Sequence, residues 1–190
     1  MNVLEERILC DGVVRPNNIL KVDSFLNHQI DPMLIGQLAV ELKEYFKDEN
    51  ITKVLTIEAS GIALGILVAQ QFNVPLLFAK KAKSANVDAD LYTSKVKSYT
   101  YNKDYSMIVS KKYIHEEDTV LIVDDFLAEG NAAYGLIDIA KQAGAKIAGI
   151  GIAIEKGFQE GGKRLREDGY DLKSLSIIES LEDNKILFRK

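Results

Sequence analysis

The sequence predicts an α/β fold in which a central, mostly parallel sheet is flanked by helices. Two observations support this fold class: strands built of consecutive apolar residues, and helical segments that alternate with them along the chain. The strands are expected at 53–58, 75–80, 119–125 and 145–155. The helices are expected at 31–46, 60–72 and 131–143. Because parallel sheets bind ligands at the carboxyl ends of their strands, functional residues are expected at that edge.

Local signals explain where these helices begin. Asp31 and Pro32 supply a capping side chain and a residue suited to the first helical position. Apolar residues then recur every four positions, at Leu34, Leu38, Leu42 and Phe46. Ser60 is expected to cap the second helix, and the third is expected to begin near Asn131 after a turn of small residues.

Residues 81–105 form a polar segment, and 84–90 carry no useful apolar periodicity. A loop of this length inside a compact domain is usually functional or mobile. We therefore expect a flexible loop over about 82–105, followed by a hairpin from about 95 to 110. A loop that closes over the active site would exclude water from a reactive intermediate.

The composition is that of one ordinary globular domain. The chain has 190 residues, of which 47% are hydrophobic and 27% are charged, so a single domain over 1–190 is expected. Cys10 is the only cysteine, which rules out an intrachain disulfide and argues against a zinc site.

Charge and hydropathy limit the location and the partners of the protein. Residues 1–7 carry acids where a secretory signal needs a basic start, and no apolar run approaches the roughly 18 residues of a membrane span. The net charge is -4 and the pI is about 5.3, unlike the basic surface of a nucleic-acid binder. We expect a cytoplasmic protein that binds neither nucleic acid nor membranes.

The most informative segment is 120–132, which joins an apolar strand to two carboxylates, a turn of small residues and a helix start. Asp124 and Asp125 suit sugar hydroxyls, while unpaired amides at the helix start, with about half a positive charge, suit a phosphate. Together they describe a ribose 5-phosphate site. The alternative is an acid pair that only ends a strand or caps a helix. A Walker-type loop is disfavoured because no lysine follows Gly130.

The segment 120–132 resembles the signature of the type I phosphoribosyltransferases, in which two acids and a small-residue loop follow an apolar strand. The resemblance implies that Asp124 and Asp125 are the catalytic acids, which hold the ribose hydroxyls of phosphoribosyl pyrophosphate (PRPP). It assigns the 5-phosphate to the residues of the following loop: Ala128, Glu129, Gly130, Asn131 and Ala132. It also implies a small hood formed by about 1–30 and 157–190, a homodimer, and Mg²⁺ held mainly by the substrate.

Three further segments, 20–29, 58–62 and 149–156, resemble the bacterial xanthine phosphoribosyltransferases, a branch of this family. That branch transfers the phosphoribosyl group from PRPP to xanthine in purine salvage, giving xanthosine 5-monophosphate and pyrophosphate. The resemblance assigns xanthine binding to Leu20, Asn27 and Lys156. Phe126, directly after the acids, is placed to pack on the base. For Lys156, an exposed lysine at a strand end is the alternative.

A second turn from strand to helix is expected to bind pyrophosphate through its amides. It consists of Glu58, Ala59, Ser60 and Gly61. Lys80 and Lys81 resemble the basic pair that family members direct at pyrophosphate, although arginine is common where Lys80 stands. Glu58 is expected either to act through a water on Mg²⁺ or to face solvent at the strand end. Later lysines are interpreted as a solvated basic face.

Two residues depart from the related hypoxanthine-guanine enzymes. Ala128 stands where those enzymes carry a carboxylate proposed to take a proton from the purine, and Glu129 places an acid inside the phosphate loop. Two alternatives stay open: an enzyme for hypoxanthine, guanine or adenine, and a non-enzymatic regulator that senses PRPP. The regulator is disfavoured because residues 1–30 lack a basic, two-helix DNA-binding pattern.

Overall fold

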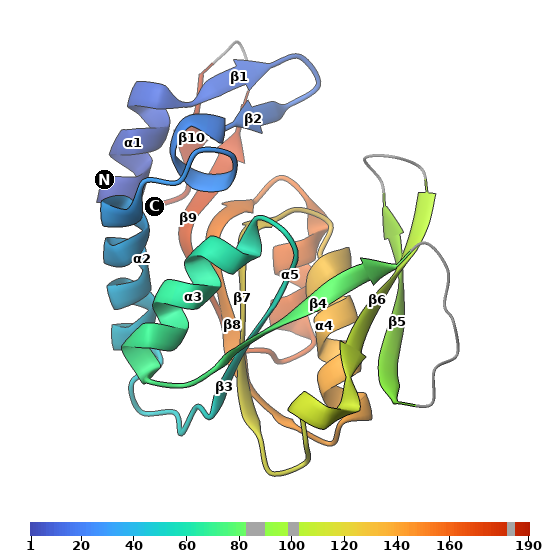
Figure 1. The fold of residues 1–190 in the computed structure, drawn as a ribbon. Coiled ribbons are helices and arrows are strands. Elements are labelled where there is room, and N and C mark those ends of the chain that lie inside the picture. Colours follow the sequence, from blue (N-terminus) through green and yellow to red (C-terminus); the bar gives the residue numbers. More distant parts are fainter. Residues whose placement is uncertain (83–89, 99–102, 182–184) are drawn as a thin grey trace.

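A computed structural model describes residues 1–82, 90–98, 103–181 and 185–190, and its strands form an eight-stranded sheet and a separate two-stranded sheet (Figure 1). The strands are β1 (Val13–Arg15), β2 (Ile19–Lys21), β3 (Lys53–Ile57), β4 (Leu76–Ala82), β5 (Leu91–Ser98), β6 (Lys103–Ser110), β7 (Thr119–Leu127), β8 (Lys146–Lys156), β9 (Leu172–Ser180) and β10 (Leu187–Phe188). The large sheet has the order β10-β9-β8-β7-β3-β4-β6-β5. All pairs from β9 to β4 are parallel, whereas β10, β6 and β5 pair antiparallel at the edges. The predicted α/β fold with a mostly parallel sheet is confirmed.

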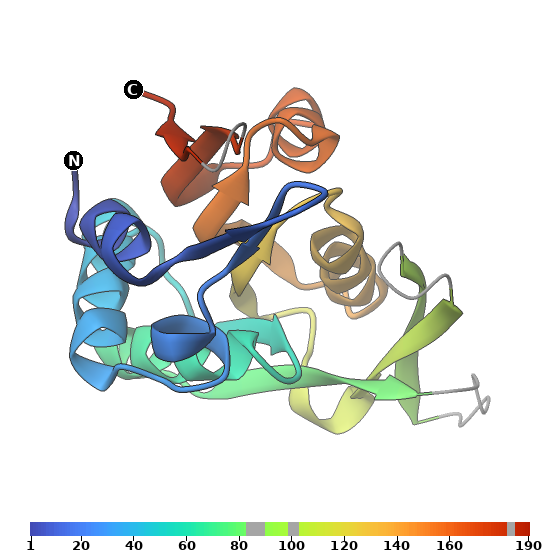
Figure 2. The same ribbon diagram turned by 90° about the horizontal axis from the view of Figure 1, so that it is seen from above.

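Helices cover both faces of this sheet, as the view from above shows (Figure 2). They are α1 (Val3–Asp11), the π-helix η1 (Asp23–Asn27), α2 (Pro32–Tyr45), α3 (Gly61–Phe72), the 3₁₀ turn η2 (Lys111–Tyr113), α4 (Asn131–Gln142) and α5 (Glu160–Glu167). One core cluster joins the sheet to α1, α2 and α3, and the other joins it to α4 and α5. In the described chain, no helix is long and apolar enough to cross a membrane.

The apolar run in β7 supplies both cores because successive side chains of a strand point to opposite faces. Leu121 and Val123 belong to the cluster under α1, α2 and α3, while Val120 and Ile122 belong to the cluster under α4. The strand pairs in parallel with β3 on one side and β8 on the other. Both faces and both edges are therefore covered, which explains why the run has no polar residue before Asp124.

The start of α2 confirms the predicted cap, whereas the start of α3 differs from the prediction. Oδ1 of Asp31 accepts hydrogen bonds of 3.1 Å from the backbone N–H groups of Met33 and Leu34, and Pro32 begins the helix. Ser60 precedes α3, but its hydroxyl donates to Asp125 and leaves the helix amides uncapped by this side chain. A cap was therefore the wrong role for Ser60, because a buried carboxylate competes for its hydroxyl.

The expected flexible loop over 82–105 is corrected in part, because Leu91–Ser98 and the start of Lys103–Ser110 are paired strands. Residues 83–89 and 99–102 lie outside the described residues. The hairpin packs on α4, where a side chain at Gly135 would come within 2.8 Å of Met107 and Val96. Burial against a helix that follows later in the chain stabilises β5 and β6, so local periodicity did not reveal the whole hairpin.

The two segments expected to form the hood differ in their relation to the sheet. Residues 1–30 contribute α1, β1, β2 and η1, which lie at the upper end in Figure 1, where the parallel strands have their carboxyl ends. Residues 157–190 contribute α5, β9 and β10, and these two strands extend the large sheet.

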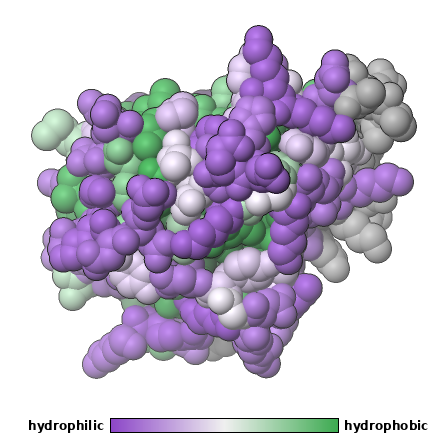
Figure 3. Space-filling model, turned by 90° about the horizontal axis from the view of Figure 1, so that it is seen from below, coloured by the Kyte–Doolittle hydropathy of each residue, from purple (hydrophilic) through white to green (hydrophobic). Residues whose placement is uncertain are grey.

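The lower end of the molecule in Figure 1 is seen face-on in Figure 3. Hydrophilic residues cover most of this face, with some hydrophobic residues between them.

Candidate active site

A cleft of ≈ 260 Å³ opens at the carboxyl ends of β7 and β8. Its walls come from these two strands, the loop and helix start after β7, the segment after β8, and β6. The lining residues are Tyr105, Asp124, Phe126, Leu127, Ala128, Glu129, Gly130, Asn131, Ala132, Ala133, Ile152, Lys156 and Gln159. The structure thus brings together the predicted phosphate loop, one predicted acid, Phe126 and Lys156.

The two predicted acids are buried side by side at the end of β7, Asp124 at 8% and Asp125 at 5% exposure. Oδ1 of Asp125 accepts a hydrogen bond of 2.9 Å from Oγ of Ser60, and Oδ2 accepts one of 3.3 Å from Nδ2 of Asn27. Oδ1 of Asp124 accepts a bond of 2.9 Å from the backbone N–H of Asp125. Asp125 therefore joins the predicted pyrophosphate turn to the N-terminal elements.

Burial raises the pKa of Asp124 well above its usual value, and the neighbouring charge of Asp125 raises it further. The backbone N–H of Asp125 and the ammonium of Lys81 oppose this rise. Since a positive charge near the pair favours its ionised form, a cation or a developing positive charge on a sugar would be stabilised here.

β7 continues to Leu127, two residues beyond the predicted strand end, so the phosphate loop begins at Ala128, as predicted. Gly130 has a φ of 84°, which favours glycine, and precedes the first turn of α4. The amides at this helix start have no partners within the helix, as an anion site requires. Glu129 is among the residues that line the cleft.

The turn from Glu58 to Gly61 lies directly against the acids. A side chain at Gly61 would come within 2.7 Å of Oδ1 of Asp124, so only glycine fits without moving that carboxylate. The peptide bond between Glu58 and Ala59 is cis. The carboxylate of Glu58 accepts a hydrogen bond of 2.6 Å from the backbone N–H of Lys81, which ties the turn to β4.

The structure separates the two lysines that were expected to act together. Lys80 and Lys81 lie within β4, not after it, because the strand continues to Ala82. Successive strand residues point to opposite faces, so Lys80 and Lys81 cannot both face Asp124. The ammonium of Lys81 lowers the pKa of Asp124 and lies 5.7 Å from the ring centre of Tyr105, which places Lys81 on the side of the cleft.

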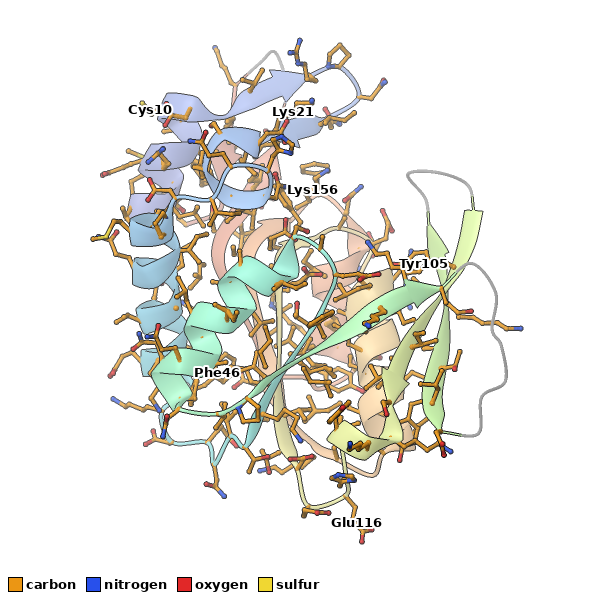
Figure 4. All side chains as sticks on the ribbon, in the orientation of Figure 1. Cys10, Lys21, Phe46, Tyr105, Glu116 and Lys156 are labelled. Carbon is orange, nitrogen blue, oxygen red and sulfur yellow. The ribbon has the colours of Figure 1, made fainter. Side chains whose placement is uncertain are left out.

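The residues predicted to bind the base occupy different positions. Figure 4 places Lys156 at the upper end of the sheet, beneath the N-terminal elements, and Tyr105 on the side of the β5–β6 hairpin. Lys156 and Phe126 line the cleft, and burial lowers the pKa of Lys156. Asn27 lies at Asp125, as its hydrogen bond shows. The side chain of Leu20 is only 6% exposed and packs in the core with α1 and α2, so it does not point into the cleft.

Sequence reasoning missed several residues at this edge, among them Tyr105 and Gln159, which line the cleft. Burial and the charge of Asp124 raise the pKa of Tyr105. Oε1 of Gln159 is buried and has no hydrogen-bond partner within the described residues. Tyr105 falls where the expected loop and the expected hairpin overlap, and Gln159 follows a strand end without any local pattern.

Metal binding by the protein alone finds no support in the part of the chain that the structure describes. No group of three or more His, Cys, Asp or Glu side chains there is arranged to hold a metal ion. A hard cation at Asp124 and Asp125 would therefore need further oxygen ligands from a substrate or from water.

The fold and the cleft define a class: an α/β protein that presents paired carboxylates between two turns suited to phosphate groups. Comparison with known families shows which family within this class the chain belongs to. A family model described as "Phosphoribosyl transferase domain" matches residues 21–188, and the chain belongs to this family. The resemblance inferred from 120–132 is thereby confirmed.

Curated relatives are similar over their full length. The chain is 57% identical over 188 residues to a xanthine phosphoribosyltransferase of Ruminiclostridium cellulolyticum, covering 99% of each chain. It is 53% identical over 189 residues to a xanthine phosphoribosyltransferase of Clostridium novyi, covering 100% of each. The resemblance to the xanthine branch is confirmed as well.

Solved structures support the same fold. An APRTase from Giardia lamblia, crystallised with 9-deazaadenine, superposes with a TM-score of 0.77 at 23% identity, covering 93% of this chain and 98% of that one. An adenine phosphoribosyltransferase from Rhodothermus marinus gives a TM-score of 0.73 at 23% identity, covering 92% and 97%. At this identity the likeness concerns the fold alone.

Proposed function

We propose that this protein transfers the 5-phosphoribosyl group from PRPP to xanthine, giving xanthosine 5-monophosphate and pyrophosphate. The observation that carries the proposal is the position of Asp125 between two turns. Its carboxylate accepts a hydrogen bond from Ser60 in the turn from Glu58 to Gly61, and the residues after it lead into the phosphate loop from Ala128 to Ala132. One ribose between these turns would have a phosphate at either end. The names of the curated relatives support xanthine as the acceptor.

On the donor side, Asp124 and Asp125 would accept hydrogen bonds from the ribose hydroxyls. Bond breaking at the anomeric carbon leaves positive charge on the ring, and two buried carboxylates stabilise that charge more than the neutral ground state. The loop from Ala128 to Ala132 would hold the 5-phosphate. The turn from Glu58 to Gly61 and the ammonium of Lys81 would hold the departing pyrophosphate.

On the acceptor side, Lys156 would donate to an exocyclic oxygen of the base and Phe126 would pack on its ring, since both line the cleft. Asn27 would reach the base edge by exchanging its bond with Asp125 for one with the base. Because the side chain of Leu20 is buried in the core, its contribution would come from the backbone.

Mg²⁺ is proposed as the cofactor, bound mainly by oxygens of PRPP. The donor set fits a hard cation, because Asp124 and Asp125 offer carboxylate oxygens while substrate and water would supply the remaining ligands. The ion would neutralise charge on the leaving pyrophosphate. A homodimer and a cytoplasmic location, both expected from the sequence, remain predictions.

The test is a spectroscopic assay of the purified protein with Mg²⁺, PRPP and each purine in turn. Xanthine should give the highest kcat/KM, with hypoxanthine, guanine and adenine well below it. Preference for hypoxanthine or guanine would replace xanthine as the acceptor and leave the donor chemistry in place. Binding of PRPP without turnover of any purine would instead favour a regulator that senses PRPP.

A further inference from the structure

Glu155 is a buried charged residue whose carboxylate lies behind the cleft, one position before Lys156 in β8. It is 1% exposed. Arg166 of α5 donates two parallel hydrogen bonds to it, from Nη1 to Oε1 at 2.8 Å and from Nη2 to Oε2 at 2.7 Å. Ser174 of β9 donates a short hydrogen bond to Oε2. Burial alone would raise the pKa of Glu155, but the bonds from Arg166 and Ser174 lower it, so the carboxylate stays ionised at neutral pH.

Helix α5 lies directly on this carboxylate and on the phosphate loop. A side chain at Gly162 would overlap Oε1 of Glu155, with Cδ only 2.5 Å away. At the preceding position, the backbone N–H of Gly161 donates a 3.1 Å hydrogen bond to the carbonyl of Ala128. A side chain at Gly161 would lie 2.6 Å from the backbone nitrogen of Gly130. Two consecutive glycines therefore connect the ion pair to the loop by backbone contact alone.

Stability is a weak reason for such an arrangement. A buried ion pair contributes little net stability, because desolvation of both charges offsets their attraction, and apolar residues of similar size often do as well. A forked arginine–carboxylate pair fixes geometry, since both bonds form only in one relative orientation. Here the fixed parts are β8 and α5, and α5 determines where Gly161 contacts the loop.

We propose that Glu155, Arg166 and Ser174 are positioning residues, which hold the first turn of α5 against residues 128–130 and so keep the 5-phosphate loop in its binding geometry. The inference rests on the proposed function, because it takes this loop to bind the phosphate of PRPP. None of the three side chains needs to touch the substrate.

The experiment compares Arg166→Ala with Lys53→Met, a control that breaks another ion pair of low exposure. Lys53 lies 2.7 Å from Asp118 at the amino end of the sheet, away from the cleft. PRPP binding is measured by titration calorimetry with Mg²⁺ and without base, beside Tm, kcat and both KM values. Arg166→Ala should weaken PRPP binding on the order of tenfold, because small displacements of a binding group are costly. Lys53→Met should lower Tm and leave PRPP binding unchanged.

Conservative variants separate positioning from loss of folding. Arg166→Lys, which keeps the charge but loses the fork, should weaken PRPP binding less than Arg166→Ala. Ser174→Ala removes only one oxygen and leaves the fork from Arg166 in place, so it should weaken PRPP binding only about twofold to threefold. In each case the KM for xanthine should change less than the affinity for PRPP.

If Arg166→Ala and Ser174→Ala lower Tm while binding PRPP as tightly as the unchanged protein, the group is merely structural and the inference is wrong. A rise in both KM values by equal factors would also overturn it. If the unchanged protein binds no PRPP at all, the proposed function itself fails, and the inference fails with it.

Discussion

Ser60 donates a hydrogen bond of 2.9 Å to the carboxylate of Asp125, across 65 positions of the chain. This contact joins the turn after β3 to the end of β7, the two places where the proposed function puts pyrophosphate and ribose. The same carboxylate accepts a hydrogen bond from Asn27, so three segments meet at one side chain. The position of Asp125 therefore depends on the conformation of both neighbouring segments.

Ser60→Ala should reduce kcat about tenfold and lower Tm by a few degrees. Removing the hydroxyl takes a donor from a buried carboxylate, which costs about 1–3 kcal/mol. Ser110→Ala serves as the matched control, because the hydroxyl of Ser110 accepts a hydrogen bond from the exposed backbone N–H of Lys112. The kcat of this control should not change. An unaltered kcat in Ser60→Ala would show that the contact has no role in turnover.

Asp124→Asn should stabilise the fold at neutral pH and abolish most activity. The raised pKa of Asp124 means that the folded protein holds this proton more tightly than the unfolded chain does. Stability from this group is therefore present at low pH and is lost as the pH rises from the usual value of 3.8 to the raised pKa of the folded state. An amide cannot ionise, so the variant avoids this loss.

Thermal unfolding of the Asp124→Asn variant across the acid-to-neutral range tests the predicted direction in which stability changes with pH. Its Tm should exceed that of the unchanged protein increasingly toward neutral pH, by about 2–4 °C for each kcal/mol of stability. Turnover should fall by about 100-fold or more, because charge stabilisation is lost in the transition state. A Tm advantage that shrinks toward neutral pH would contradict the assigned direction.

Gly61→Ala should damage both folding and activity, because its side chain would overlap Oγ1 of Thr56 and lie 2.7 Å from Oδ1 of Asp124. Gly36→Ala is the matched control: it lies within α2, and a side chain there meets nothing within 4 Å. The control should gain about 0.5–1 kcal/mol from better helix propensity and keep its activity. Chemical denaturation and the xanthine assay measure both. Equal behaviour of the two variants would refute the close contact.

Lys156→Met should raise the KM for xanthine about tenfold or more, since a hydrogen bond from a charged group contributes about 1.5–3 kcal/mol. Binding of PRPP should change little. Burial lowers the pKa of Lys156, so the unchanged protein should lose xanthine affinity on alkaline titration before an exposed lysine would lose its proton. Xanthine's own titration affects both proteins and cancels in the comparison. If Lys156→Met lost xanthine affinity over the same alkaline range as the unchanged protein, deprotonation of Lys156 would not be the cause of that loss.

Removal of Mg²⁺ by a chelator should stop turnover without lowering Tm. In the described ranges, no cluster of three or more suitable side chains holds a metal, so a contribution of the ion to folding is not expected. Adding Mg²⁺ back should restore the rate in the presence of PRPP. A fall in Tm on chelation of the substrate-free protein would instead reveal a metal held by the chain itself.

Much of the fold follows from local sequence patterns. The parallel strands and their helices were predictable because apolar runs, caps and helix periodicity are short-range signals, as Asp31 and the β7 run show. The site edge was predictable for the same reason, since the carboxyl ends of parallel strands lie together. The β5–β6 hairpin was only partly predictable, because its burial depends on Val96 and Met107 packing at Gly135.

The finer geometry of the site depends on contacts between distant segments. The bond from Ser60 to Asp125 and the forked pair from Arg166 to Glu155 join residues from different elements. No local spacing in the sequence predicts either contact. Glu155 is the second-to-last residue of an apolar strand, a position where an acid is usually expected to face solvent. Lys80 and Lys81 read as a functional pair, although strand geometry directs them to opposite faces.

Glu155 and Lys156 are consecutive residues of β8, with one buried against α5 and the other lining the cleft. A slip of this strand by one residue would move both by about 3.3 Å and exchange their faces. A slip that changed the direction of the Lys156 side chain would therefore also move the Glu155 carboxylate away from Arg166. A lineage that acquires a new acceptor base would therefore have to do so by exchanging individual side chains around the cleft, while the backbone of β8 stays fixed.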